Sequence, residues 1–171
     1  MGTNRDIRTW AGGSADDQDR LLAHLEENPG DTHELISALT CGERRVEDGA
    51  AAVLLRLAEA QPAQVEPFVH RLFRIAGGSE QQAVRLAIAG AAPKLTLRSR
   101  QAGRLAFVFE SWLDDRDPDI KRAAMTALVA LVPQRPSLGP RIRSEIERRA
   151  EEGSPTAIKH GLKLLESLRE F

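Results

Sequence analysis

The sequence contains little cysteine, few aromatic residues and no long apolar run. Cys41 is the single cysteine, tyrosine is absent, and aromatic residues make up 4% of the 171 positions. One cysteine excludes an intrachain disulfide and a cysteine cluster for zinc. No apolar run approaches the roughly 18 residues that a membrane helix needs. The N-terminus also lacks the basic and then apolar layout of a signal peptide. We therefore expect a cytoplasmic protein with no membrane segment, and we find no indication of a metal or a cofactor.

The residues that are abundant indicate a folded, helical protein. Hydrophobic residues make up 42% of the chain and charged residues 29%, which is ordinary for a globular domain. A chain of this length can bury roughly 70% of its unfolded surface in one core. Alanine, leucine and arginine are common, and they favour helix over the aromatic and β-branched residues that strands prefer. The composition predicts an all-α fold.

Charge is distributed unevenly along the chain although its net value is −1. Residues 1–60 carry 12 acids and 6 bases, whereas residues 61–171 carry 13 acids and 18 bases. The stretch from Gln81 to Phe109 contains no acid and five bases: Arg85, Lys94, Arg98, Arg100 and Arg104. This stretch forms either a basic face or an ordinary solvated helix surface. The chain lacks the pI above about 9 of a dedicated nucleic-acid binder, so nucleic acid is not the favoured partner.

One apolar pattern recurs along the chain. In the stretch Asp117–Leu131, apolar residues stand at offsets 0, 4, 7, 8 and 11 from Ile120, which is one face of a helix. The same five offsets are apolar from Val46 and from Val84. From Ile158 only the first three fit, because Glu166 and Arg169 occupy the last two. The four starting positions are 38, 36 and 38 residues apart. Such spacing predicts a helical repeat.

A further helix is expected before each of these four helices. The predicted ranges are Asp31–Thr40, Pro67–Ala76, Arg100–Leu113 and Pro140–Glu151. Pro118 and Pro155 follow Asp117 and Ser154, which is the arrangement of a capping residue before the first helical position.

Two capping boxes and the N-terminal organisation complete the prediction. Asp31 with Glu34 and Ser79 with Gln82 have the spacing of capping boxes. Residues 1–16 are expected to be a flexible leader, in which Trp10 is either packed or exposed, and a leader helix is expected over Asp17–Glu27. The predicted architecture is an α-α superhelix of about four helix–turn–helix repeats, forming a single domain over residues 17–171.

The pattern resembles the HEAT repeat, a two-helix unit of about forty residues. The resemblance rests on the run Asp117-Pro118-Asp119-Ile120-Lys121-Arg122-Ala123-Ala124, with partial copies at Val84-Arg85 and Ile158-Lys159. Val46-Glu47 departs from the pattern because an acid stands where a base is usual. The resemblance covers about residues 31–170. It implies that second helices line a concave face, which is the usual binding surface of such proteins.

The bases of the second helices are the candidate partner-binding residues. Under the resemblance, Arg85, Lys121 and Lys159 occupy equivalent places, and Arg122 and Lys163 extend the same surface. We expect a non-catalytic scaffold that binds a protein partner along this face. The alternative is a structural ladder, in which these bases pair with turn acids such as Asp117.

Two enzyme classes within the same family resemblance remain as alternative hypotheses. HEAT-like glycosylases that remove alkylated DNA bases use aromatic and acidic residues, and Trp112 with Asp114 or Asp115 resembles that combination. A bilin lyase-like protein is the other alternative. Trp112 lies on the apolar stripe of its helix, however, which predicts burial. We predict no catalytic residue and no metal site, because the histidines are scattered and Cys41 has no nearby histidine in sequence.

Overall fold

The computed structural model describes residues 4–169, and every regular element in this range is a helix. The predicted all-α class is therefore confirmed. The chain divides into two compact units, with the boundary between Thr96 and Leu97. The sequence had predicted one repeat domain over residues 17–171, and the structure groups the chain differently. Each unit has its own buried apolar core.

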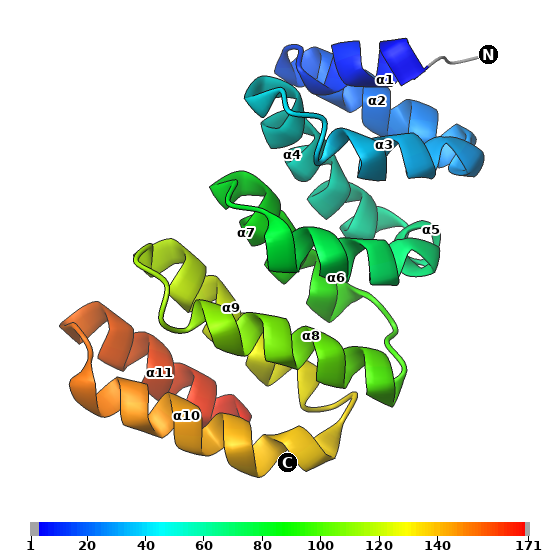
Figure 1. Cartoon of the computed structure of the whole chain (residues 1–171). Coiled ribbons are helices and arrows are strands. Elements are labelled where there is room, and N and C mark those ends of the chain that lie inside the picture. The colour runs from blue at the N-terminus through cyan, green and yellow to red at the C-terminus, as the bar shows by residue number, and fades with distance from the viewer. Residues whose placement is uncertain (1–3, 170–171) are drawn as a thin grey trace. The chain divides into compact units, whose positions relative to one another are not determined.

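Unit 1 is assembled around one long central helix. Its helices are α1 (Asn4–Ala11), α2 (Ala15–Glu27), α3 (Thr32–Ala38), α4 (Arg44–Ala60), α5 (Pro62–Val65), α6 (Val69–Gly78) and α7 (Gln82–Ala91). Helix α4 contacts α1, α2, α3, α5 and α7, and Figure 1 shows α3 and α6 beside their partners α4 and α7. The chain leaves α7 through the short 3-10 helix Ala92–Lys94, because Pro93 cannot continue an α-helix.

The prediction of a flexible leader over residues 1–16 was wrong for the part that the structure describes. Residues 4–11 form helix α1, in which Ile7 and Ala11 are fully buried. Helix α1 packs so closely on α4 that a Cβ added to Gly49 would lie 1.7 Å from the Ala11 carbonyl oxygen. Trp10 packs against His24, with ring centroids 5.5 Å apart in an edge-on arrangement. This segment is thus part of the unit 1 core.

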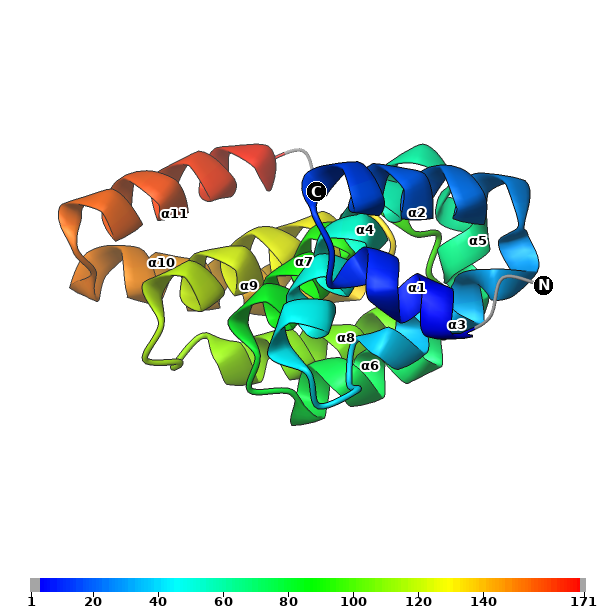
Figure 2. The same ribbon diagram turned by 90° about the horizontal axis from the view of Figure 1, so that it is seen from above.

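Unit 2 consists of two antiparallel helix pairs. Its helices are α8 (Ser99–Trp112), α9 (Pro118–Leu131), α10 (Gly139–Glu152) and α11 (Pro155–Ser167). Helix α8 pairs with α9, α10 pairs with α11, and α9 also contacts both α10 and α11. Figure 2 shows α10 and α11 running in opposite directions from a short turn. The pairs form because each helix has one apolar face and a short connection.

Two of the predicted helix caps are confirmed. The Asp117 side chain accepts a hydrogen bond from the Asp119 N–H, and the Ser154 hydroxyl accepts one from the Ala157 N–H. The capping box predicted at Asp31 is absent, since the Asp31 carboxylate lies 2.8 Å from His24 Nε2.

The other predicted box, at Ser79, is also wrong. Helix α7 begins one residue after Gln81, and Ser79 instead accepts from the Gln81 N–H. A capping box does form at an unpredicted place, between Ser14 and Asp17 at the start of α2.

The apolar stripes predicted for α4, α7 and α9 are all buried. For α11 the predicted register was one residue late: Leu162 is 56% exposed, whereas Gly161, Leu164 and Leu168 are buried. Counted from Ala157, the five offsets fall on Ala157, Gly161, Leu164, Leu165 and Leu168.

The error in the α11 register arose because position 161 is a glycine, which an apolar template does not count as a buried position. Glycine fits at position 161 since a Cβ there would lie 3.1 Å from the Ala150 Cβ of α10. The close approach of α10 and α11 therefore fixes the register.

Candidate functional site: a cleft between α9 and α11

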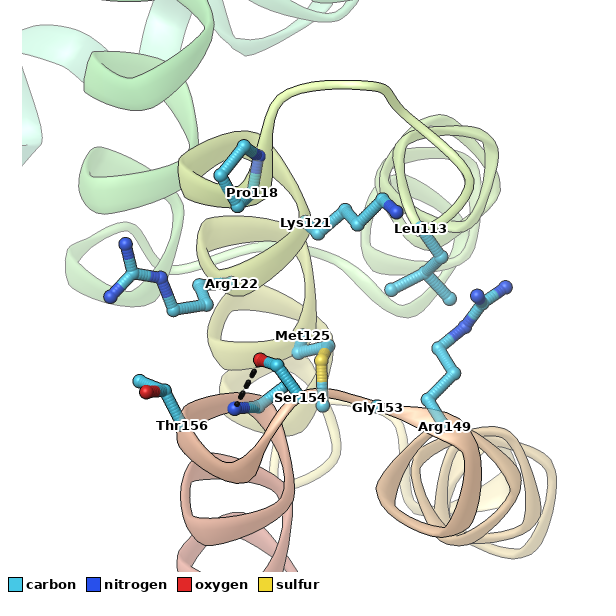
Figure 3. Close-up of a pocket in the computed structure, with 10 residues that line it drawn as sticks. Leu113, Pro118, Lys121, Arg122, Met125, Arg149, Gly153, Ser154 and Thr156 are labelled. Carbon is cyan, nitrogen blue, oxygen red and sulfur yellow. Dashed lines mark hydrogen bonds between the residues drawn. The ribbon is translucent and has the colours of Figure 1, made fainter.

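Unit 2 contains a cleft of about 640 Å³ between the first turns of α9 and α11 (Figure 3). Helix α8 contributes the residue that follows its last turn, and α10 contributes its final turn. The lining residues are Leu113, Pro118, Lys121, Arg122, Met125, Arg149, Gly153, Ser154, Thr156 and Ala157. The cleft falls in the size range of ligand pockets, roughly 300–1,000 Å³.

Helix α9 supplies two bases and the thioether of this cleft. Because α9 begins at Pro118 and buries Ile120, the next two residues, Lys121 and Arg122, are exposed. They extend toward opposite sides of α9, with Met125 one turn further along (Figure 3). Met125 is only 5% exposed. The arrangement combines an apolar surface with two positive charges at its edge.

Arg149 crosses from α10 to hold the end of α8. Its Nη1 lies 3.0 Å from an Asp114 oxygen, and its Nη2 lies 2.7 Å from a Glu145 oxygen. The hydrogen bond from Arg149 lowers the pKa of Asp114. Burial raises the pKa of Glu145, but hydrogen bonds from Arg148 and Arg149 outweigh it and leave that pKa below its ordinary value. Arg149 is thus a structural cation whose charge is already matched by two carboxylates.

Two further polar groups of the cleft, Arg122 and Ser154, also have local partners. The Arg122 guanidinium is paired with Asp119, one turn earlier on the same helix. The Ser154 hydroxyl caps α11. An exposed pair such as Arg122–Asp119 contributes only about 0–1 kcal/mol, so a partner carboxylate can replace Asp119 at little cost. Lys121 and Arg122 are consequently the cations that a ligand can reach.

The other predicted binding residues lie outside the cleft. Lys159 and Lys163 are exposed on α11, and no ion pair of either is seen among the described residues. Arg85 is half-buried on α7 in unit 1. With α11 counted from Ala157, Ile158 stands at the place of Lys121, and Lys159 stands at the place of Arg122. The predicted equivalence of Lys121 and Lys159 is therefore corrected by one residue.

Unit 1 has a cleft at the corresponding place with a different charge. It measures about 540 Å³ and lies between the starts of α4 and α7. Glu47 stands there at the offset that Lys121 has in α9. Its side chain is 6% exposed and accepts a hydrogen bond of 2.8 Å from the Gly42 N–H. The acid that departs from the repeat pattern therefore closes the α3–α4 turn and occupies the place of Lys121, so that Arg44 and Arg74 are the bases lining the unit 1 cleft.

Sequence reasoning did not find Met125 or Arg149 as lining residues. Met125 stands between the template positions of α9, and Arg149 is a charged residue of α10 that an apolar template does not mark. The only local signal was that Arg149 follows Glu145 by one helical turn. Its contact with Asp114 spans 35 residues of sequence, and helical periodicity carries no information about such a contact.

Trp112 is buried, as its place on the apolar stripe predicted. Its side chain is 4% exposed, and its ring lies 5.2 Å from the Phe109 ring. It is therefore not placed to stack on a nucleic-acid base. Within residues 4–169, no group of three or more His, Cys, Asp or Glu side chains is placed to hold a metal ion. None of the described helices is both long and apolar enough to cross a membrane.

Comparison with known proteins supports the fold and is silent on activity. No protein-family model matches the sequence, and a search of curated proteins finds no match. One solved structure that is similar is the crystal structure of an engineered protein from the Northeast Structural Genomics Consortium. The likeness covers 98% of this chain and 72% of that chain, with a TM-score of 0.63 and 17% sequence identity. At this identity the likeness shows a shared fold alone.

Proposed function

We propose that this protein is a non-catalytic, HEAT-like interaction module that binds an acidic segment of a partner protein. The binding surface consists of the unit 2 cleft and the neighbouring exposed face of α11. The observation that carries the proposal is the placement of Lys121 and Arg122 beside Met125 at a cleft. Lys159 and Lys163 add two further exposed charges on α11.

The repeat character is supported by the recurrence of one packing rule. The five offsets counted from Val46, Val84, Ile120 and Ala157 are apolar or small, and all are buried except two that are half-buried, Ala157 and Leu165. Each of these helices follows another helix after a short turn. This recurrence supports a two-helix repeat of the HEAT type. The starting positions are 38, 36 and 37 residues apart once the α11 register is corrected.

The chemistry of the cleft suits an acidic peptide with an apolar residue. Methionine adapts its shape to different apolar side chains, which is why it is common at surfaces that accept peptides. Apolar burial supplies about 25 cal/mol for each Å² removed from water. Each exposed ion pair adds about 0–1 kcal/mol and acts mainly on orientation and association rate. Such a site holds a partner segment without chemical change.

Binding is tested by comparing partner capture by the native protein and by a cleft variant. The variant replaces Lys121, Arg122, Lys159 and Lys163 with alanine. Proteins captured from the native host by each form are identified by mass spectrometry, and the most enriched partner is then titrated in purified form. We expect the cleft variant to bind this partner about thirtyfold more weakly, because four charges are lost at roughly 0.5 kcal/mol each.

A matched control removes charge from unit 1 instead. Arg45 and Lys94 are exposed there, and a variant with glutamine at both positions should bind the partner as the native protein does. Circular dichroism must show the same melting for all three forms. Equal binding by the native protein and the cleft variant would contradict the proposal and favour a structural role for the bases. The single cysteine suits a reducing compartment, so we propose the cytoplasm as the site of action.

A further inference from the structure

The exposed side of α8 carries two arginines and a phenylalanine on one face. Arg100, Arg104 and Phe107 are separated by four and three residues, which places them next to one another on a helix. Phe107 is 73% exposed, the most exposed large hydrophobic side chain among the described residues. These residues lie in the acid-free stretch of the sequence, and the proposed cleft function does not use them.

A third arginine is fixed beside this face. Arg135, which follows α9, lies over Gly103, and a Cβ at residue 103 would be 1.7 Å from its Nη1. The guanidinium donates hydrogen bonds of 3.3 Å to the Ser99 carbonyl and to the Ser137 hydroxyl. Gly103 and Phe107 are one helical turn apart. Arg100, Arg104, Phe107 and Arg135 therefore form one surface, the α8 arginine face.

Within the described part of the chain, the arginines of this face have no carboxylate partner, unlike four other arginines of unit 2. Four other arginines of the unit are paired with carboxylates: Arg122 with Asp119, Arg141 with Glu110, Arg148 with Glu145, and Arg149 with Asp114 and Glu145. Among residues 4–169, no ion pair is seen for Arg100, Arg104 or Arg135. Three guanidinium groups next to an exposed ring thus have no carboxylate in this range that compensates their charge.

We propose that the α8 arginine face is a second binding surface, which takes an acidic protein segment carrying an aliphatic side chain between carboxylates. Carboxylates of the segment pair with the guanidinium groups, whose planar fork suits bidentate contact. The aliphatic side chain covers Phe107. Aromatic and arginine residues together are typical of the side chains that dominate protein interfaces. This surface is separate from the α9–α11 cleft and does not depend on it.

Two other anionic partners fit the face less well. Single-stranded nucleic acid is held by several stacked aromatic side chains along a basic groove, and Phe107 is the one large aromatic strongly exposed here. Stable attachment to a membrane needs more apolar area than one phenylalanine supplies. A protein segment needs only one apolar contact between charged neighbours.

The test uses the full chain with the cleft bases already replaced, so that binding at the cleft cannot contribute. The probe is a fluorescein-labelled synthetic peptide in which each leucine is flanked by glutamates, titrated by fluorescence anisotropy. We expect binding that weakens by up to about fivefold for each of Arg100→Gln and Arg104→Gln, the fold-change of one exposed ion pair. Phe107→Ser should also weaken it. Arg116→Gln removes an exposed charge from the α8–α9 turn and should leave binding unchanged.

Three companion probes decide between partner classes. A peptide with glutamine in place of every glutamate should lose binding, and labelled oligothymidylate and phosphatidylglycerol vesicles should bind more weakly than the acidic peptide. Absence of peptide binding would overturn the proposal, as would equal binding by the face variants. Tighter binding of oligothymidylate or vesicles would overturn it in favour of phosphate recognition. Failure here leaves the cleft proposal untouched, because the cleft bases are absent in every sample.

Discussion

Single residues fix how the helices of unit 2 meet. Ser154 begins α11 by accepting the Ala157 N–H, and Arg149 joins Asp114 at the end of α8 to Glu145 on its own helix. Gly161 lets α10 approach α11 closely. Ser154 and Arg149 lie outside the apolar stripes, and Gly161 occupies a stripe position without contributing an apolar side chain. They decide register and turn geometry, which apolar burial alone leaves loosely specified.

The register of α11 can be tested with two leucines. Leu164 is 9% exposed and Leu162 is 56% exposed. Leu164→Ala should destabilise the protein by about 2–5 kcal/mol, because it leaves a cavity in the core. Leu162→Ala should change stability by no more than about 0.5 kcal/mol, as for other surface positions. Urea unfolding of both variants measures the difference. The opposite ranking would restore the register counted from Ile158.

The Arg149 network predicts a dependence of stability on pH. The folded pKa values of Asp114 and Glu145 lie below their ordinary values of 3.8 and 4.5. Because these pKa values are lowered in the folded state, the ionised carboxylates stabilise the fold at pH values above the ordinary pKa values. The stabilisation is lost as the pH falls through the lowered pKa values of the folded state. Arg149→Gln should therefore lower the melting temperature at pH 7. Below about pH 4.5, the melting temperature of this variant should fall less steeply with decreasing pH than that of the native protein. Thermal melts across this range measure it.

Arg56→Gln serves as the control for that experiment. Arg56 is paired with Asp19 in unit 1, whereas Asp114 and Glu145 belong to unit 2. The melting temperature of Arg56→Gln should fall with decreasing pH as steeply as that of the native protein. If Arg149→Gln and Arg56→Gln gave the same profile, the network around Arg149 would not be the source of the pH dependence.

At the scale of the element, α1 shows how a short helix is held by its neighbours. Isolated helices of its length are unstable in water, and α1 has only eight residues. It is ordered because Ile7 and Ala11 are buried and because Gly49 lets the Ala11 carbonyl approach α4. Its order therefore depends on a residue nearly forty positions away in the sequence.

Gly49→Ala is expected to displace α1. A Cβ at 1.7 Å from the Ala11 carbonyl oxygen cannot be accommodated without movement of the backbone, which typically costs about 1–3 kcal/mol. Hydrogen exchange of the α1 amides should become faster. Ala52→Ser, at an exposed position on the same helix, should leave exchange in α1 unchanged. Unaltered protection of α1 in Gly49→Ala would show that the helix is held by other contacts.

At the scale of the whole molecule, the two units differ in net charge. Residues 1–96 carry 10 bases and 14 acids, a net charge of −4, whereas residues 97–171 carry 14 bases and 11 acids, a net charge of +3. Both proposed binding surfaces lie in the positive unit. The division of charge therefore follows the division into compact units at Thr96. It concentrates affinity for acidic segments in the second unit.

Because each unit has its own core, a destabilising substitution in one unit is expected to reduce the protection of that unit more than that of the other. In repeat architectures each element is stabilised chiefly by its nearest neighbours. Leu164→Ala should therefore accelerate hydrogen exchange in α10 and α11 more than in α4 and α7. Mass spectrometry of exchanged peptides from the two units measures this. An equal loss of protection in both would show that the chain unfolds as one cooperative body.

Most helices and two caps followed from the sequence, because they depend on neighbours within a turn or two. The apolar offsets from Val46, Val84 and Ile120 located three second helices and their buried faces. Asp117 and Ser154 located two helix starts. The two predicted capping boxes failed because each side chain has another hydrogen-bond partner. The Asp31 carboxylate contacts His24, and the Ser79 hydroxyl accepts from Gln81 outside the helix that it was expected to cap.

For the candidate site, the sequence identified Lys121 and Arg122 but not the cleft that they border. Helical period and capping are properties of contiguous residues, so the sequence by itself determined the all-α class, the repeated pattern and the exposure of these two bases. Only the tertiary structure decided the register of α11, the docking of α1, and the meeting of Arg149 with Asp114. Each of these depends on how closely two distant helices approach. That distance is set by side-chain volume at the contact, and above all by the glycines at 49 and 161.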